Sequence, residues 1–338
     1  MPITSKRTVY KPFEYDWAYT YYKKMRSLHW VPEEAPLQED VRDWVQKCNP
    51  LEKNLIAQIF RFFTQGDVDV AKCYAERYIP AFPMPEFQML FASIMDSEAN
   101  HIDSYSQLID TLGFGESEYQ AFLEYAAMRD KHDYLFAEND TAPSGRKWSR
   151  KERLALDIAK FSAFGEGMQL FASFAILLSF KNRNLMKGMS TIVEWSIRDE
   201  TLHVEVMSQV FRTLRGENPK LRNLELDGAI YQTGRDMVDL EDKFIDLAFD
   251  MGGVEGITPD DTKLYIRFIA DRRFQQLGLE PIYNVTENPF AEWIDWLISA
   301  QTHANFFEAR STEYSKGGIA GWDDGFAFLD NKVVDISQ

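Results

Sequence analysis

The sequence is poor in cysteine, and its first residues contain no apolar segment. Its 338 residues include two cysteines, Cys48 and Cys73, which form no Cys-x-x-Cys pair. A disulfide scaffold and a thiolate metal site are therefore not expected, and a cytoplasmic location is the default. Residues 1–10 carry Lys6 and Arg7, but no apolar run follows them, so we expect no signal peptide.

The chain also lacks an excess of positive charge and a long uninterrupted apolar run. The formal net charge is −16, whereas nucleic-acid binding requires a basic surface. The longest apolar stretch, residues 170–180, is shorter than the roughly 20 residues of a membrane span and is expected to be a buried helix. Neither a nucleic acid nor a membrane is an expected partner. The many acidic residues are either solvated surface groups or carboxylates that bind cations.

Strand-like alternation is almost absent, and apolar residues recur instead with the spacing of helices. Helices are predicted at residues 14–26, 51–78, 86–112, within 116–136, and at 150–180, 186–215, 221–251 and 259–277. Long helices joined by short links predict an all-α bundle. We expect one helical domain, residues 1–310, followed by a flexible tail rich in Gly, Ser, Asp and Lys, residues 311–338.

Two Glu-x-x-His motifs are the strongest chemical signal. They are Glu98-Ala-Asn-His101 and Glu200-Thr-Leu-His203, each on a predicted long helix with apolar residues before it. Positions i and i+3 share a helix face, so a carboxylate and an imidazole at this spacing can bind one cation. A single motif of this kind is commonly a solvated charge pair. Two of them in apolar surroundings predict a buried metal site.

A di-metal site in a helical bundle needs one further carboxylate from each of two other helices. Glu166 is the candidate on one of them, since it lies between Gly165 and Gly167 in a nearly uncharged run. On another helix, Asp67 and Asp69 both qualify. With one of these aspartates, four carboxylates balance the charge of two divalent cations. Mixed oxygen and nitrogen ligands favour iron or manganese.

The order of these residues resembles the ligand series of the class I ribonucleotide reductase small subunit. In that series the ligands here are Asp67, Glu98, His101, Glu166, Glu200 and His203. The family spacing selects Asp67 over Asp69. Residues 97–105 resemble the family segment that ends in the radical tyrosine, and residues 198–203 resemble its second histidine motif. The resemblance covers roughly residues 30–314.

The resemblance implies a ferritin-like helical bundle with additional helices, a homodimer, and two metal ions per chain. The metals would be di-iron, di-manganese or mixed, and dioxygen or superoxide would oxidise them. The oxidising equivalent would rest on Tyr105 or on the metals. It would pass through Trp30 and Tyr314 to the large catalytic subunit, which reduces ribonucleoside diphosphates. Asp199 would hydrogen-bond His101 and connect it to Trp30, Glu308 would accompany Tyr314, and the tail would dock to the large subunit.

Some observations leave alternatives open. Ser196 stands where the family often has an apolar residue, so a more polar pocket is expected around Tyr105. Without the resemblance, Tyr105 and Trp30 would be interpreted as core aromatics. A ferritin-like di-metal oxidase or oxygenase acting on a bound organic substrate is the main alternative function, and a metal-storing helical protein is the second. Only the reductase function needs Tyr314 and a docking tail.

Overall fold

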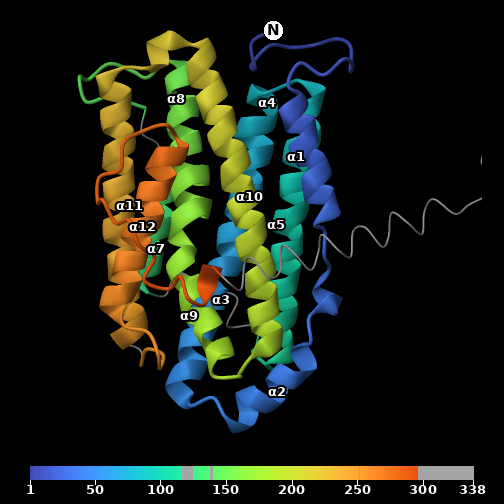
Figure 1. The fold of residues 1–338 in the computed structure, drawn as a ribbon, viewed down its shortest axis with the longest axis vertical. Helices are drawn as coiled ribbons and strands as arrows, with labels where there is room; N and C mark the ends of the chain where they lie inside the picture. Colours follow the sequence, from blue (N-terminus) through green and yellow to red (C-terminus); the bar gives the residue numbers. More distant parts are fainter. Residues whose placement is uncertain (116–124, 138–139, 251, 296–338) are drawn as a thin grey trace, which may run out of the picture.

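The computed structural model describes residues 1–115, 125–137, 140–250 and 252–295 (Figure 1). Within these ranges the chain is helical, and its only β-type pairing is an isolated bridge between Thr141 and Lys147. The prediction of an all-α bundle is confirmed. The helices are α1 (Asp16–Ser27), η1 (Pro32–Glu34), α2 (Leu37–Gln46), α3 (Pro50–Cys73), η2 (Tyr74–Tyr78), α4 (Ile79–Ala81), α5 (Pro85–Thr111), α7 (Ala126–Phe136), α8 (Arg150–Asp157), η3 (Ile158–Gln169), α9 (Phe171–Asn182), α10 (Lys187–Glu217), η4 (Pro219–Leu221), α11 (Leu224–Asp250) and α12 (Pro259–Gln276).

The long helices lie side by side along the long axis of the molecule (Figure 1). Helix α3 packs along α5, and α10 packs against η3 and α9. Helices α11 and α12 pack on each other at one side of this bundle, and α1 covers α5 at the other. The centre of the bundle is therefore enclosed by α3, α5, η3 and α10.

Capping residues fix where helices α3 and α8 begin. At the start of α3, the Asn49 side chain accepts hydrogen bonds from the backbone N–H groups of Leu51 and Glu52, and the Glu52 carboxylate accepts one from the backbone N–H of Asn49. Ser149 and Glu152 form the same reciprocal pair at the start of α8. Each capping box satisfies backbone N–H groups that have no partner inside the helix.

Helix α2 was not predicted from the sequence, and its role is clear only in three dimensions. It lies across the start of α10, where the buried carboxylate of Asp40 accepts hydrogen bonds from the backbone N–H groups of Gly188 and Met189. Asp43 accepts one from Met186. The aspartates of α2 thus cap α10, whose N-cap residue is a methionine with no capping side chain.

Two predicted α-helices contain π-helical segments, which the sequence did not indicate. Residues 74–78 form η2 after α3, and residues 158–169 form η3 between α8 and α9. A π-turn holds more residues than an α-turn and changes the direction of the side chains around it. Segment η3 carries Glu166. A Cβ on the neighbouring Gly167 would lie 2.8 Å from atoms of both Arg273 and Val204, so a glycine is needed there.

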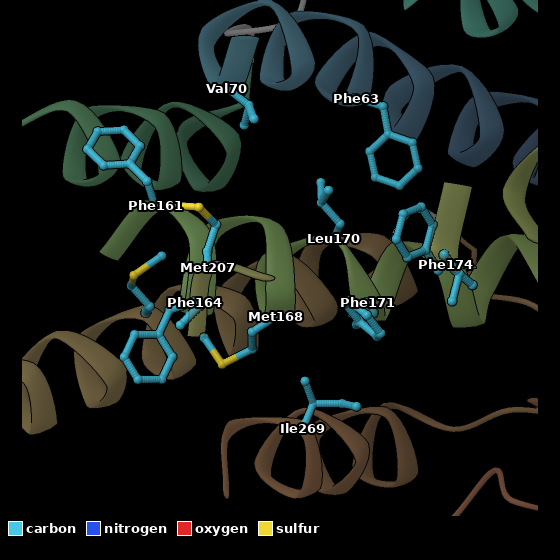
Figure 2. Packing of buried hydrophobic residues seen from close by; sticks show 14 of the residues in the cluster. Phe63, Val70, Phe161, Phe164, Met168, Leu170, Phe171, Phe174, Met207 and Ile269 are labelled. Atoms are coloured by element: carbon cyan, nitrogen blue, oxygen red, sulfur yellow. The ribbon is translucent and has the colours of Figure 1, made fainter. Parts of the chain in front are cut away.

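The core is built largely from aromatic and aliphatic side chains of these central helices. Phe63 projects from α3 toward Phe174 (Figure 2), and the centroids of the two rings are 5.1 Å apart. The continuous segment Arg150–Asn182 is long and apolar enough to cross a membrane, but its most apolar window is wholly buried in the bundle. Its apolar character is that of a core helix.

Candidate metal centre

The side chains predicted as metal ligands come from the four central helical segments, and all of them are buried. They are Asp67 of α3, Glu98 and His101 of α5, Glu166 of η3, and Glu200 and His203 of α10. Within each Glu-x-x-His motif the i and i+3 residues share one helix face, so both side chains point to the bundle interior. The helices thus bring together all six residues.

The six side chains form two overlapping groups of potential ligand atoms. Atoms within 4.8 Å of one another define one group of Asp67, Glu98 and His101, and a second of Glu98, Glu166, Glu200 and His203. Glu98 belongs to both, since its Oε1 lies 2.9 Å from Nδ1 of His203 and its Oε2 lies 3.5 Å from Nδ1 of His101. Glu200 also faces both imidazoles, at 3.3 Å from Nδ1 of His101 and 3.4 Å from Nδ1 of His203. Two metal positions with a shared carboxylate fit this geometry.

The electrostatics of the cluster fit bound cations. Among the described residues, no Lys or Arg forms an ion pair with these four carboxylates, and Oδ2 of Asp67 and Oε1 of Glu166 have no hydrogen-bond partner. Burial and the charge of Glu200 raise the pKa of Glu166 well above its usual value, and burial and Glu98 do the same for Asp67. Buried carboxylates without partners are costly. Two divalent cations would supply the missing positive charge.

The geometry separates the two aspartates that compete in the sequence. Asp67 is 2% exposed and belongs to the first ligand group. The carboxylate of Asp69 lies instead 3.2 Å from Nε2 of His132, away from that group. Helical spacing explains the difference, because residues i and i+2 point about 200° apart around a helix.

Asp199 connects the ligand cluster to Trp30. The indole Nε1 of Trp30 donates a 2.7 Å hydrogen bond to Oδ2 of Asp199, and Nε2 of His101 lies 3.4 Å from the same oxygen. Arg198 donates to the other oxygen, at 3.0 and 3.1 Å. Burial acts to raise the pKa of Asp199, but His101 and Arg198 lower it to about 2. A carboxylate at the second nitrogen of a histidine orients the imidazole and fixes its tautomer.

Tyr105 lies one turn after His101 on the same helix, with ring centroids 6.3 Å apart. Its ring packs against Phe60 and Phe63, and it is 2% exposed. The phenol donates a 2.8 Å hydrogen bond to the hydroxyl of Ser196 on α10. Ser196, which stands where the family often has an apolar residue, therefore contacts Tyr105 directly.

Tyr74 is a neighbour of the cluster that the sequence analysis missed. Its phenol donates a hydrogen bond to Oε2 of Glu166, with the two oxygens 3.3 Å apart, and the side chain is buried. The sequence feature that could have indicated Tyr74 is its position seven residues after Asp67, which places both residues on one helix face. This spacing does not identify the hydrogen-bond partner of Tyr74, because Glu166 comes from another part of the chain.

A cavity of about 530 Å³ reaches the cluster from the α1 side of the bundle. Its lining includes Trp30, Asp199 and His203 together with the more exposed His29 and Asp96. Glu308 and Tyr314, the predicted relay residues, and the tail of residues 311–338 lie outside the described residues.

A helical bundle in which two Glu-x-x-His motifs and two further carboxylates converge defines the class of ferritin-like di-metal carboxylate proteins. The comparison with protein families then specifies the family. Residues 7–289 match the model of the ribonucleotide reductase small chain, and the chain belongs to this family. It is thus a small-subunit component of an oxidoreductase.

Individual relatives agree with this assignment. The chain is 44% identical to a probable ribonucleoside-diphosphate reductase small subunit, 048L, of Invertebrate iridescent virus 3, over 94% of this chain and 87% of the viral protein. It is 31% identical to the ribonucleoside-diphosphate reductase small chain of Variola virus, over 97% and 98%. Among solved structures, the dimanganese(II) NrdF protein of Streptococcus sanguinis has the same fold, with a TM-score of 0.74, 18% identity, and coverage of 87% of this chain and 99% of that one.

Membership in the family decides between the functions that the sequence left open. The reductase small-subunit function is the one predicted from the order of the ligand residues, and it is confirmed at the level of the family. The oxidase or oxygenase function and the metal-storage function are set aside.

Proposed function

We propose that this chain generates the radical that starts the reduction of ribonucleoside diphosphates in a separate large catalytic subunit. The main support for the proposal is that two groups of buried potential ligands share Glu98 at the centre of the bundle. The chain that forms this bundle belongs to the small-chain family. The names of the viral relatives support ribonucleoside diphosphates as the substrates of the assembled enzyme.

The proposed cofactor is a pair of metal ions. Its ligands would be the six residues of the cluster: Asp67, Glu98, His101, Glu166, Glu200 and His203. Carboxylate and imidazole ligands are compatible with iron, manganese or one of each, and the related Streptococcus sanguinis protein holds dimanganese(II). After oxidation by dioxygen or superoxide, the bound metals would supply a strong one-electron oxidant at this position.

The residues around the cluster would hold and transmit the oxidising equivalent. Tyr105 is enclosed by Phe60 and Phe63, which exclude water from its ring. Asp199 holds His101 and Trp30 on one carboxylate oxygen, while Arg198 keeps that carboxylate ionised and in place. This hydrogen-bonded connection supports a role in electron transfer between the cluster and the cavity beside Trp30.

The C-terminal part of the chain would complete the pathway. We assign Tyr314 and Glu308 to the relay toward the large subunit, and residues 311–338 to a docking tail that follows a helical domain of residues 1–310. Phe326, Phe328 and Leu329 provide apolar anchors for docking. A homodimer in the cytoplasm completes the proposal, and a solved neighbour from Saccharomyces cerevisiae is a homodimer.

Deletion of residues 311–338 tests the proposal. We expect the truncated protein to bind two metal ions and to keep its thermal stability, because the ligands lie in the bundle. Ribonucleotide reduction with the large subunit should fall below detection. The control is Tyr314→Phe in the full-length chain, which should still bind the large subunit but lose activity. Full activity of the truncated protein would contradict the proposed docking role.

A further inference from the structure

Three buried tyrosines near the ligand cluster differ in what accepts their phenolic hydrogen bond. Tyr74 donates to the carboxylate of Glu166 at 3.3 Å. Tyr105 donates to the hydroxyl of Ser196 at 2.8 Å. Tyr78 donates to the backbone carbonyl of Asp157 at 3.1 Å. All three side chains are at most 2% exposed, so bulk solvent does not reach them.

The acceptor matters because a tyrosine that loses one electron becomes a very strong acid. Its oxidation is easier where a neighbouring base can take the phenolic proton at the same time. A carboxylate can hold that proton, whereas a serine hydroxyl and a backbone carbonyl accept hydrogen bonds without becoming protonated. Of the three acceptors, only Glu166 has this capacity.

The position of Glu166 lets it serve a metal and Tyr74 together. Its Oε2 accepts the hydrogen bond of Tyr74, while its Oε1 is buried and has no hydrogen-bond partner among the described residues. Glu166 also belongs to the second ligand group. One oxygen can thus bind a cation while the other remains the proton acceptor of Tyr74.

The surroundings of Tyr74 protect an oxidised ring. It lies in π-helical segment η2, and its ring packs at 5.0 Å from Tyr78 and 5.9 Å from Phe91, measured between centroids. It is 1% exposed. These contacts keep solvent and solutes away from the ring, as Phe60 and Phe63 do for Tyr105.

We propose that Tyr74 is a second redox-active tyrosine of the metal centre, distinct from Tyr105. In the proposed step, Tyr74 gives one electron to the oxidised metal pair and its phenolic proton to Oε2 of Glu166. The products are a neutral phenoxyl on Tyr74, a metal pair reduced by one electron, and a protonated Glu166. The inference rests on the proposed di-metal function, because that centre is the oxidant.

Electron paramagnetic resonance on rapidly frozen samples tests the assignment. Full-length protein is loaded with iron or with manganese, exposed to dioxygen or superoxide, and frozen at a series of times. The variants are Tyr105→Phe, Tyr105→Phe/Tyr74→Phe and Tyr105→Phe/Tyr78→Phe, each of which keeps the ring and removes only the hydroxyl. Ring-deuterated tyrosine identifies a signal as tyrosyl by the collapse of its hyperfine structure.

We expect a tyrosyl signal in Tyr105→Phe that persists when Tyr78 is also replaced and is lost when Tyr74 is also replaced. Tyr78 is the matched control, because it is as buried as Tyr74 and lies against it but has no carboxylate acceptor. Peptide mass spectrometry gives a second readout, with oxidation products at Tyr74 expected to increase in Tyr105→Phe.

Two results would overturn the inference. One is the absence of any tyrosyl signal in Tyr105→Phe although metal analysis and optical spectra show a bound and oxidised centre. The other is a tyrosyl signal that survives in the double variant Tyr105→Phe/Tyr74→Phe. A chain that fails to bind or oxidise metal would instead refute the proposed function itself, and the inference with it, so the two failures are distinguishable.

Discussion

Asp199 connects the ligand cluster to Trp30 through a single side chain. It binds no metal in the proposed site. Its Oδ2 accepts a 2.7 Å hydrogen bond from the indole Nε1–H of Trp30 and lies 3.4 Å from Nε2 of His101. Its other oxygen, Oδ1, accepts two hydrogen bonds from the guanidinium of Arg198. A change at this residue should therefore affect the connection between cluster and indole more than the cluster itself.

We expect Asp199→Asn to retain the metal pair but to lower ribonucleotide reduction by about 10- to 100-fold, the usual effect of removing a carboxylate behind a metal histidine. The amide keeps the shape of the side chain but cannot accept from Trp30 and balance Arg198 equally well. The measurement is turnover with the large subunit, alongside metal content.

Asp96→Asn is the matched control for this prediction, since Asp96 lines the same cavity but its side chain is 73% exposed and faces His29. It should leave turnover unchanged. Equal losses in both variants would mean that the cavity surface, rather than the Asp199 connection, limits activity.

At this scale the sequence was informative about spacing and uninformative about contacts between helices. The repeated Glu-x-x-His motif and the apolar surroundings of Glu166 indicated the ligands, because both are local patterns. The hydrogen bond from Tyr74 to Glu166 joins α3–η2 to η3 and has no local pattern. The choice of Asp67 over Asp69 needed the family resemblance, since both aspartates have similar neighbours in the sequence.

Among the helical elements, η3 is the one whose shape matters most for the site. Its π-helical geometry carries Glu166, and Gly167 lets Arg273 approach closely enough to donate a 2.7 Å hydrogen bond to the Gly167 carbonyl. A methyl group there would collide with Arg273 and Val204.

We expect Gly167→Ala to destabilise the protein by about 1–3 kcal/mol, the usual cost of inserting a methyl group into a packed core. Metal binding should weaken with it, because the neighbouring Glu166 would shift. Thermal unfolding and metal titration are the measurements.

Gly228→Ala is the control. A Cβ there meets open space in helix α11, so we expect the free energy of unfolding to rise by about 0.5–1 kcal/mol. Destabilisation of both variants alike would contradict the packing argument.

The start of α8 provides a prediction for the pH dependence of stability. The hydrogen bonds from Arg146 to Glu152 lower the pKa of that carboxyl to about 2, although burial acts to raise it. A carboxyl with a lowered pKa in the folded state contributes stability that is full above its unfolded pKa, near 4.5, and is lost as the pH falls toward 2.

We therefore expect Glu152→Gln to lower the melting temperature at neutral pH, and the difference from the unmodified protein to shrink as the pH falls below about 4.5. Differential scanning calorimetry of both proteins from neutral pH to below about 4.5 measures this difference in melting temperature. A difference that stays constant with pH would show that the side chain acts through its shape and capping hydrogen bonds rather than through its charge.

The elements themselves were largely predictable, because a helical repeat over many residues is a strong local signal. Helices α5, α10 and α12 begin and end within two residues of the predicted bounds. Helix α2 is only ten residues long, and the hydrogen bonds from the start of α10 to its aspartates have no local pattern in the sequence. The π-helical segments were missed because apolar periodicity does not distinguish a local change of turn size.

For the whole molecule, the main consequence of the fold is the concentration of negative charge at its centre. Four carboxylates are buried where α3, α5, η3 and α10 meet, in a chain whose net charge is already −16. Bound cations would then hold the four segments together as well as support chemistry. The sequence could predict the bundle and the residues that cluster at its centre, but not such features as the buried ion pair between Lys131 of α7 and Glu241 of α11, at 2.6 Å.

The most direct test of the account is anomalous X-ray diffraction from crystals of the full-length chain grown with iron or manganese. We expect two metal peaks per chain, both contacted by Glu98, with His101 at one and His203 at the other. In a matched Glu98→Ala crystal, at least one peak should be lost. A single peak, or two peaks that do not share Glu98, would contradict a di-metal centre bridged by this carboxylate.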